Sequence, residues 1–300
     1  MGDESSVLAT ALSGPSNITR VGEVRARESL HEAIRQACAD AKIDPRQLKR
    51  ACIGAAGAGR KETASVIREM AAEVISGDIE VVGDMQIALQ AALGEGPGVI
   101  VIAGTGSIAY GRDARGKIAR AGGWGFAISD EGSAHWIGRT AVAAVLRAAD
   151  QGLDDRSSSD LSPADQGSQE SSPIFREMKE ILNLNSLKQL ARKANSHPDF
   201  AVLFPAVLTA ANSGDAVAQS VFAQAARELA QLAVIVLRRL FPERDGAVPM
   251  AMVGGVFRHA PMIRELFYNE VRTACPRIVL NSEVVEPVHG ALQMARRSAS

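Results

Sequence analysis

Short apolar runs that end at glycine turns recur along the chain, and they constrain the fold more than any other feature of the sequence. The clearest are GPGVIVIAGTGS, which ends at Ser107, and GAVPMAMVGGVF, which ends at Phe257. Stretches with apolar residues at helical spacing separate such runs. Because strands that alternate with helices form βαβ units, this pattern predicts an α/β fold with a parallel sheet.

The same periodicities place the individual elements. SIAYGRDARGKIARAGG is typical of a hairpin with DARG at its tip, and Gln151–Pro173, rich in Ser, Asp, Gln and Gly, predicts a mobile loop. The predicted strands are Val7–Leu12, Arg50–Gly54, Ile79–Gly83, the runs before Gly104 and Gly254, and Arg277–Ser282. The predicted helices are Glu23–Lys42, Glu62–Val74, Met85–Leu93, Ala134–Ala149, and two that start at Ala260 and Val288.

The overall charge indicates the kind of partner. The chain has 300 residues, with 33 basic and 34 acidic side chains. A length of this order predicts two domains or one large α/β unit. A net charge near zero gives no broad electrostatic footprint for nucleic acid or an anionic membrane, so we expect a small-molecule partner.

Several common types of site and location are not indicated. The first residues lack the pattern of an export signal, and the apolar runs are too short to cross a membrane, so we expect a cytoplasmic protein. Three distant cysteines and five histidines show no metal-ligand spacing, so no resident metal site is predicted. Neither a serine-hydrolase elbow nor a Walker-type phosphate loop occurs in the sequence.

Two glycine turns are candidates for anion binding. Gly104, Thr105, Gly106 and Ser107 follow a buried strand, where backbone N–H groups and hydroxyls can surround phosphate oxygens. The alternative is a plain hairpin turn. The second turn, at Gly254 and Gly255, could equally serve only close packing of a helix on a strand.

Asp84 follows a strand that ends at the edge where open α/β sheets collect ligands. There its carboxylate could act as a general base, or it could cap the helix that begins at Met85. Asp130 has the same alternative role for the helix through Trp136, and Ser129 could be the cap instead.

Gly122–Trp136, GGWGFAISDEGSAHW, holds both tryptophans of the chain among paired glycines and adjacent carboxylates. An ordinary core helix needs neither feature. The segment therefore predicts a tight surface turn or part of a site.

Taken in order, the segments PSN, GAAGAG, VVGD, AGTGS, GGWG with SDEGSAHW, and VGGVF resemble the N-acetylglucosamine kinase family. This family belongs to the actin, Hsp70 and sugar-kinase superfamily, with the BadF/BadG/BcrA/BcrD-type ATPases. The resemblance implies two actin-like (ribonuclease H-like) domains with a central cleft. It places residues 1–103 and 286–300 in the first domain and residues 104–285 in the second.

The resemblance also implies roles for individual residues. Asp84 would take the proton from a sugar 6-hydroxyl, and ATP with Mg²⁺ would supply the phosphoryl group. The residues implied to bind the amino sugar are Asn17, Gly122, Gly123, Trp124 and Asp130. Those implied to contact the nucleotide are Gly104, Thr105, Gly106, Ser107, Gly254 and Gly255.

The start of the chain departs from the family pattern. Family members begin with a strand and a DGGGTKT-type phosphate hairpin, whereas Val7–Leu12 is similar to the second strand of that hairpin. We therefore expect the true start to lie upstream by about one hairpin. The alternatives are a non-catalytic sugar-binding regulator and an activator ATPase with an iron–sulfur cluster. Ile18 and Thr19 follow Asn17 where some members have an aromatic residue, which leaves glucosamine open as substrate. A homodimer also stays open.

Overall fold

In a computed structural model of the chain, residues 6–153, 172–196, 199–242 and 246–297 are described. The chain divides into two compact units. Unit 1 consists of Met1–Glu95 and Glu286–Ser300, and unit 2 consists of Gly96–Val285. Helices and sheets occur in both, so the predicted α/β class is confirmed.

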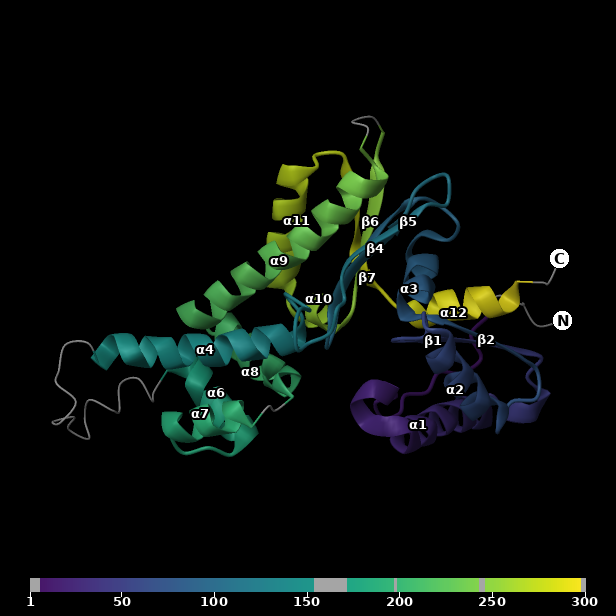
Figure 1. Cartoon of the computed structure of the whole chain (residues 1–300), viewed down its shortest axis with the longest axis horizontal. Coiled ribbons are helices and arrows are strands. Elements are labelled where there is room, and N and C mark those ends of the chain that lie inside the picture. The colour runs from purple at the N-terminus through teal and green to yellow at the C-terminus, as the bar shows by residue number, and fades with distance from the viewer. Residues whose placement is uncertain (1–5, 154–171, 197–198, 243–245, 298–300) are drawn as a thin grey trace. The chain divides into compact units, whose positions relative to one another are not determined.

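Unit 1 is built on a pair of parallel strands, β1 and β2, which run in register from Arg50 opposite Asp78 to Ala55 opposite Gly83. Helix α12 packs on α3 and β1, although it comes from the far end of the chain (Figure 1). The elements of unit 1 are α1 (Ile18–Asp40), η1 (Pro45–Gln47), β1 (Arg50–Ala55), α2 (Lys61–Ala72), β2 (Asp78–Gly83), α3 (Asp84–Leu93) and α12 (Pro287–Arg296).

The first helix begins earlier than its apolar spacing predicts. Asn17 caps it, because the side-chain oxygen accepts a hydrogen bond from the N–H of Thr19 at 3.1 Å. At Gly22 the backbone has φ 78° and ψ 164°, which interrupts the helix, so the regular part starts at the predicted Glu23.

The predicted strand Val7–Leu12 is wrong. The described residues 6–17 form neither a strand nor a helix, and the side chain of Leu12 is 93% exposed. Alternating apolar residues favour a strand only if a neighbouring strand binds the backbone N–H and C=O groups. Among the described residues of unit 1, β1 and β2 pair only with each other.

Unit 2 contains a five-stranded sheet with strand order β5-β4-β3-β6-β7. Strands β3, β6 and β7 are parallel, and the β4–β5 hairpin adds two antiparallel strands, with Asp113–Gly116 at its tip as predicted. The elements of unit 2 are β3 (Gly98–Ala103), β4 (Ser107–Arg112), β5 (Ile118–Gly122), α4 (Ala134–Leu153), α6 (Pro173–Leu182), α7 (Leu187–Asn195), η2 (Phe200–Leu203), α8 (Phe204–Asn212), α9 (Ala216–Leu240), β6 (Val248–Val253), α10 (Gly255–His259), α11 (Pro261–Ala274) and β7 (Ile278–Val285).

Helix α9 organises the core of unit 2. It packs against α11, α4 and strands β3 to β5, and Phe222 and Leu229 on its inner face are fully buried (Figure 1). Within the described part of the chain, α9 alone has the length and apolar composition to cross a membrane. Its buried face explains that composition, because the core helix of a globular unit passes the same test.

Most of the predicted mobile loop lies outside the described residues. Residues 154–171 are not among the described residues, whereas residues 151–153 continue helix α4. The remaining predicted helices and strands are confirmed, with ends that differ by a few residues.

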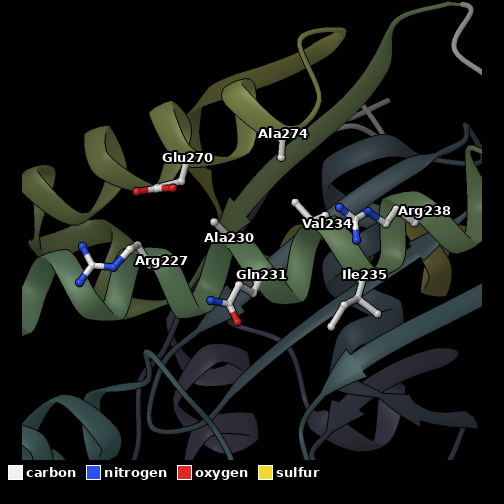
Figure 2. Close-up of a pocket in the computed structure, with 8 residues that line it drawn as sticks. All are labelled: Arg227, Ala230, Gln231, Val234, Ile235, Arg238, Glu270 and Ala274. Atoms are coloured by element: carbon white, nitrogen blue, oxygen red, sulfur yellow. The ribbon is translucent and has the colours of Figure 1, made fainter.

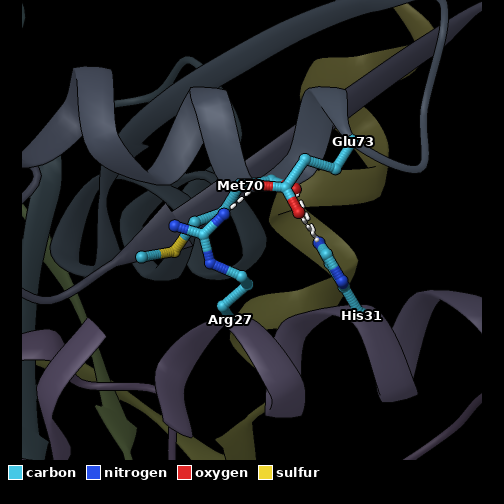
Figure 3. Close-up of polar contacts among 4 residues, drawn as sticks. All are labelled: Arg27, His31, Met70 and Glu73. Atoms are coloured by element: carbon cyan, nitrogen blue, oxygen red, sulfur yellow. Dashed lines mark hydrogen bonds and ion pairs between the residues drawn. The ribbon is translucent and has the colours of Figure 1, made fainter. Parts of the chain in front are cut away.

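A buried histidine fastens α1 to the end of α2 in unit 1. The Nε2 atom of His31 lies 2.7 Å from the carbonyl oxygen of Met70, to which it donates a hydrogen bond. His31 is 9% exposed, and Met70 lies in the last turn of α2, where carbonyl groups lack helical partners. Beside this bond Glu73 forms an ion pair with Arg27, and both charged side chains are more than 40% exposed (Figure 3).

We predict that His31→Ala lowers the free energy of unfolding by about 2 kcal/mol, because it leaves a buried carbonyl without its donor. Arg27→Ala should cost less than about 1 kcal/mol, since exposed ion pairs contribute little. Denaturant titrations of both variants and the wild type measure the two losses. Equal losses would contradict the assignment of His31 as the fastening residue.

Candidate functional site

Two glycine turns lie next to each other in unit 2, at the ends of neighbouring strands. Strands β3 and β6 are parallel, and Ile102 pairs with Val253, so both strands end at the same edge of the sheet. Gly104 follows β3 and Gly254 follows β6. In open α/β sheets this edge is where ligands bind.

The contact between these turns leaves no room for a side chain. Gly254 has φ 102°, and a Cβ atom there would lie 2.4 Å from the carbonyl oxygen of Ala103 and 3.2 Å from the nitrogen of Gly104. Only glycine fits this backbone without strain. The two turns, predicted separately from the sequence, therefore form one continuous backbone surface.

The turn of residues 104–107 is held by backbone bonds, and it is here called the nucleotide turn after the role that the sequence resemblance implies for it. The N–H of Gly104 donates to the carbonyl of Gly106 at 2.9 Å, and the N–H of Ala134 donates to the carbonyl of Gly104 at 2.8 Å. Thr105 is exposed at its tip, with a hydroxyl that can donate to an anion. The turn is thus held by backbone bonds at Gly104 and exposed at Thr105.

Ser107 differs from Thr105, because its hydroxyl already has an acceptor. The Oγ atom donates to the carbonyl oxygen of Glu131 at 2.7 Å, and the residue is 3% exposed. A hydroxyl has one proton to donate. In this conformation the Ser107 hydroxyl cannot also donate to a phosphate.

The segment 122–133, here called the sugar loop after the role that the resemblance implies for it, places the carboxylate of Asp130 against the nucleotide turn. The backbone N–H groups of Gly125 and Ser107 lie near that carboxylate. Asp130 is 7% exposed and has φ 68°, an uncommon conformation for a residue other than glycine. Burial raises the pKa of Asp130 above its ordinary value, while the two N–H groups oppose this rise.

Neither Asp130 nor Ser129 is the N-cap of the helix that follows, so that alternative is wrong. Helix α4 begins at Ala134, and the hydroxyl of Ser133 accepts a hydrogen bond from the N–H of Trp136 at 3.1 Å. Ser133 therefore has the position and the bond of the cap. Residues 131–133 separate Asp130 from the first residue of α4.

Trp124 and Trp136 have different environments. Trp136 is 7% exposed and belongs to the core of unit 2, whereas Trp124 is 68% exposed in the sugar loop. The guanidinium of Arg120 lies over the Trp124 ring, 4.5 Å from its centroid. A cation at this distance is attracted to an indole face, so Arg120 helps to orient a ring that has few other contacts.

Sequence patterns gave no indication of Arg120 or of the aromatic contacts beneath the sugar loop. The ring of Phe126 lies 4.9 Å from that of His135, which in turn lies 5.4 Å from that of Phe200. Arg120 and Trp124 flank a glycine pair at the end of β5, a signal that could have suggested their proximity. His135 and Phe200 come from distant segments, so their contact needed the fold.

In unit 1, Asp84 is the first residue of α3, directly after β2. Its carboxylate accepts a hydrogen bond from the N–H of Met85 at 2.9 Å. Gly83 is the N-cap of α3, and the helix begins at Asp84. The alternative role of Asp84, as the cap of a helix that begins at Met85, is therefore wrong. Burial raises the pKa of Asp84 above its ordinary value, against the lowering effect of backbone hydrogen bonds.

The structure brings predicted residues together in unit 2. In unit 2, the nucleotide turn, Gly254, Gly255 and the sugar loop converge around the ends of β3 and β6. In unit 1, Asp84 starts α3, and Asn17 caps α1 through its side-chain oxygen, which leaves the amide N–H groups as the donors for a ligand.

A groove of about 390 Å³ lies between helices α9 and α11 (Figure 2). None of its lining residues is one of the predicted site residues. Its walls are Arg227, Ala230, Gln231, Val234, Ile235, Arg238, Glu270 and Ala274.

The cysteines are poorly suited to hold a metal cluster. Burial raises the pKa of Cys52 to about 11 and also raises the pKa of Cys38, which disfavours the thiolate forms that bind metals. Across residues 6–153, 172–196, 199–242 and 246–297, no three His, Cys, Asp or Glu side chains are grouped as metal ligands.

Comparison with protein families and relatives gives full-length matches. A family model described as the BadF/BadG/BcrA/BcrD ATPase family matches residues 1–295. An N-acetylmuramic acid/N-acetylglucosamine kinase of Clostridium acetobutylicum is 31% identical over 291 residues, which cover 97% of this chain and 91% of the relative. An N-acetyl-D-glucosamine kinase of Dictyostelium discoideum is 25% identical, with the same coverage of 97% and 91%.

Solved structures share the fold. A candidate N-acetylglucosamine kinase from Chromobacterium violaceum has a TM-score of 0.70 and 25% identity, over 96% of this chain and 90% of that one. A ROK-family glucokinase from Streptomyces griseus, in complex with glucose and AMPPNP, has a TM-score of 0.59 and 14% identity, over 99% and 94%. At the latter identity the likeness shows the fold alone.

Proposed function

Because the chain belongs to the BadF/BadG/BcrA/BcrD ATPase family, we propose that it is an ATP-dependent kinase of hexosamines. It would transfer the γ-phosphoryl group of ATP to the 6-hydroxyl of N-acetylglucosamine or glucosamine. The observation that carries the proposal is the close approach of the two glycine turns at the ends of β3 and β6. One turn would bind the phosphates and the other would lie against the rest of the nucleotide.

The nucleotide turn fits the phosphates of ATP. Gly104 and Gly106 carry no side chain to cover the backbone, and exposed Thr105 adds a hydroxyl donor. Such turns after a strand bind anions through their N–H groups. Gly254 and Gly255 would lie against the nucleotide, at a place where a Cβ atom on Gly254 would collide with the first turn. Mg²⁺ would arrive with ATP, where it neutralises phosphate charge during transfer.

The sugar loop provides the chemistry to bind an amino sugar. Trp124 offers an exposed indole face, and such faces cover the apolar C–H groups of a sugar ring. Gly122 and Gly123 have φ of 75° and 69°, and a Cβ atom on either would press against side chains of unit 2, so both glycines shape the turn whose backbone would bind the sugar. A carboxylate has about four acceptor sites, so Asp130 can accept hydrogen bonds from sugar hydroxyls.

Asp84 would act as the general base, and Asn17 would hold the sugar through its amide. Burial raises the Asp84 pKa, so its carboxylate is a stronger base than an exposed aspartate. Phosphoryl transfer needs little covalent help from the protein, so the remaining residues contribute mainly by positioning the two substrates.

N-acetylglucosamine is the first substrate to test, because the names of two relatives include its kinase activity. Glucosamine is the second, because Ile18 and Thr19 differ from the aromatic residue that some family members place there. All three cysteines are free thiols, as is typical of proteins in a reducing compartment. We therefore propose a cytoplasmic location.

We predict that Asp84→Asn lowers kcat by about 10² to 10⁴-fold, because it removes the base while keeping the side-chain shape. Sugar affinity, measured by calorimetry, should stay close to that of the wild type. The matched control is Asp44→Asn, since Asp44 also accepts a backbone N–H at a helix start in unit 1. Near-normal kcat in the Asp84 variant would reject its role as base.

The pH dependence follows from the same carboxylate. Because burial raises the pKa of Asp84, its base form is lost as the pH falls through a value above the ordinary 3.9 or so. We predict that kcat/KM declines on the acid side through this raised value and is constant above it. Asp130 also has a raised pKa and is proposed to bind the sugar. The sugar affinity of the Asp84→Asn variant, measured over the same pH range, therefore shows the effect of Asp130 on binding without that of Asp84. An acid limb at or below the ordinary value would contradict the role of a buried base.

A further inference from the structure

Ser107 stands where the nucleotide turn meets the sugar loop, and it directs both of its donors to the sugar loop. Its hydroxyl donates to the carbonyl oxygen of Glu131 at 2.7 Å, and its backbone N–H lies near the Asp130 carboxylate. The residue is 3% exposed. This buried hydrogen bond and the neighbouring carboxylate hold the two segments against each other.

The surrounding atoms leave little freedom for the segments to move apart or past each other. A Cβ atom on Gly106 would lie 2.8 Å from an oxygen of Asp130, so the carboxylate sits directly on the turn. At the other end of the sugar loop, Gly122 pairs with Ile108, the residue that follows Ser107. The sugar loop is therefore tied to one short stretch of β4 at both of its ends.

The sugar loop has few other contacts to keep it in order. Trp124 is 68% exposed and Ile128 is 84% exposed, so little apolar surface is buried near the tip. Asp130 holds its positive φ only because its surroundings impose it. A segment with these properties lies at the low-stability end of a fold, where binding nearby can order it.

We infer that Ser107 is a positioning residue that couples the two substrates, so that nucleotide on its turn raises the affinity of the sugar loop for the amino sugar. This inference rests on the proposed function. Nucleotide bound to residues 104–106 would restrict the remaining motion of the turn, and the contacts of Ser107 would transmit that restriction to Asp130 and Glu131. The sugar then pays less conformational entropy on binding, and by linkage the sugar raises nucleotide affinity by the same factor.

The orientation of the Ser107 hydroxyl separates this role from a direct phosphate contact. The hydroxyl proton forms the hydrogen bond to Glu131. Removing the hydroxyl therefore breaks a bond between the two segments but breaks no bond to the nucleotide. Loss of a phosphate contact would weaken nucleotide binding equally with and without sugar. Loss of the link instead removes the mutual effect of the two ligands.

Calorimetry measures the coupling directly. The affinity for N-acetylglucosamine is determined with and without a saturating non-hydrolysable ATP analogue, and the ratio is the coupling factor. We expect a wild-type factor of about 5 to 150, and a factor close to one in Ser107→Ala. Ser107→Thr keeps the hydroxyl and should restore part of the factor.

Ser129→Ala is the matched control. It also removes a hydroxyl that donates to Glu131, at 3.0 Å, but that bond goes to the side chain and stays within the sugar loop. Its coupling factor should equal that of the wild type. An unchanged factor in Ser107→Ala, or an equal loss in Ser129→Ala, would overturn the inference.

Hydrogen exchange on the wild-type chain provides a test that needs no variant. Addition of the nucleotide analogue alone should slow exchange in residues 122–133, and unchanged exchange there would overturn the inference. A wild type that binds both ligands independently would reject the coupling while the proposed function stands. A wild type that binds no amino sugar would reject the proposed function and the coupling together.

Discussion

The parallel pairing of β3 with β6 is the interaction on which the candidate site depends. Val99, Ile100 and Val101 of β3 are fully buried, so apolar burial fixes this strand in the centre of the unit 2 sheet. Its neighbour β6 is buried in the same way along most of its length. Because the strands are parallel and in register, both of their glycine turns emerge at one edge, and the backbone contact at Gly254 follows.

Asp130 shows how one carboxylate can serve both structure and binding. Its carboxylate lies against Gly106 of the nucleotide turn, and under the proposed function its acceptor sites would bind sugar hydroxyls. Burial without the nearby N–H groups of Gly125 and Ser107 would favour the neutral acid, which is a poorer acceptor. The backbone donors thus help to keep Asp130 in the form that both roles need.

The sequence was sufficient to predict the elements whose side chains are buried in a regular pattern. The apolar runs of β3 and β6 and the DARG hairpin are examples, since local composition determines them. The strand at Val7–Leu12 could not be judged from its own residues, because a strand exists only with a partner. The bond from Ser107 to Glu131 joins residues 24 positions apart, and the contact of Arg120 with Trp124 depends on where a loop turns, so neither follows from spacing.

We propose that this chain transfers a phosphoryl group to the 6-hydroxyl of an amino sugar. The most direct measurement is the product formed from N-acetylglucosamine and ATP with Mg²⁺, identified by phosphorus–proton NMR correlation. We predict a phosphate signal coupled to the two protons on carbon 6, which should be missing without enzyme. Sugar that binds in calorimetry but gains no phosphate would contradict the claim and favour a non-catalytic sugar-binding protein.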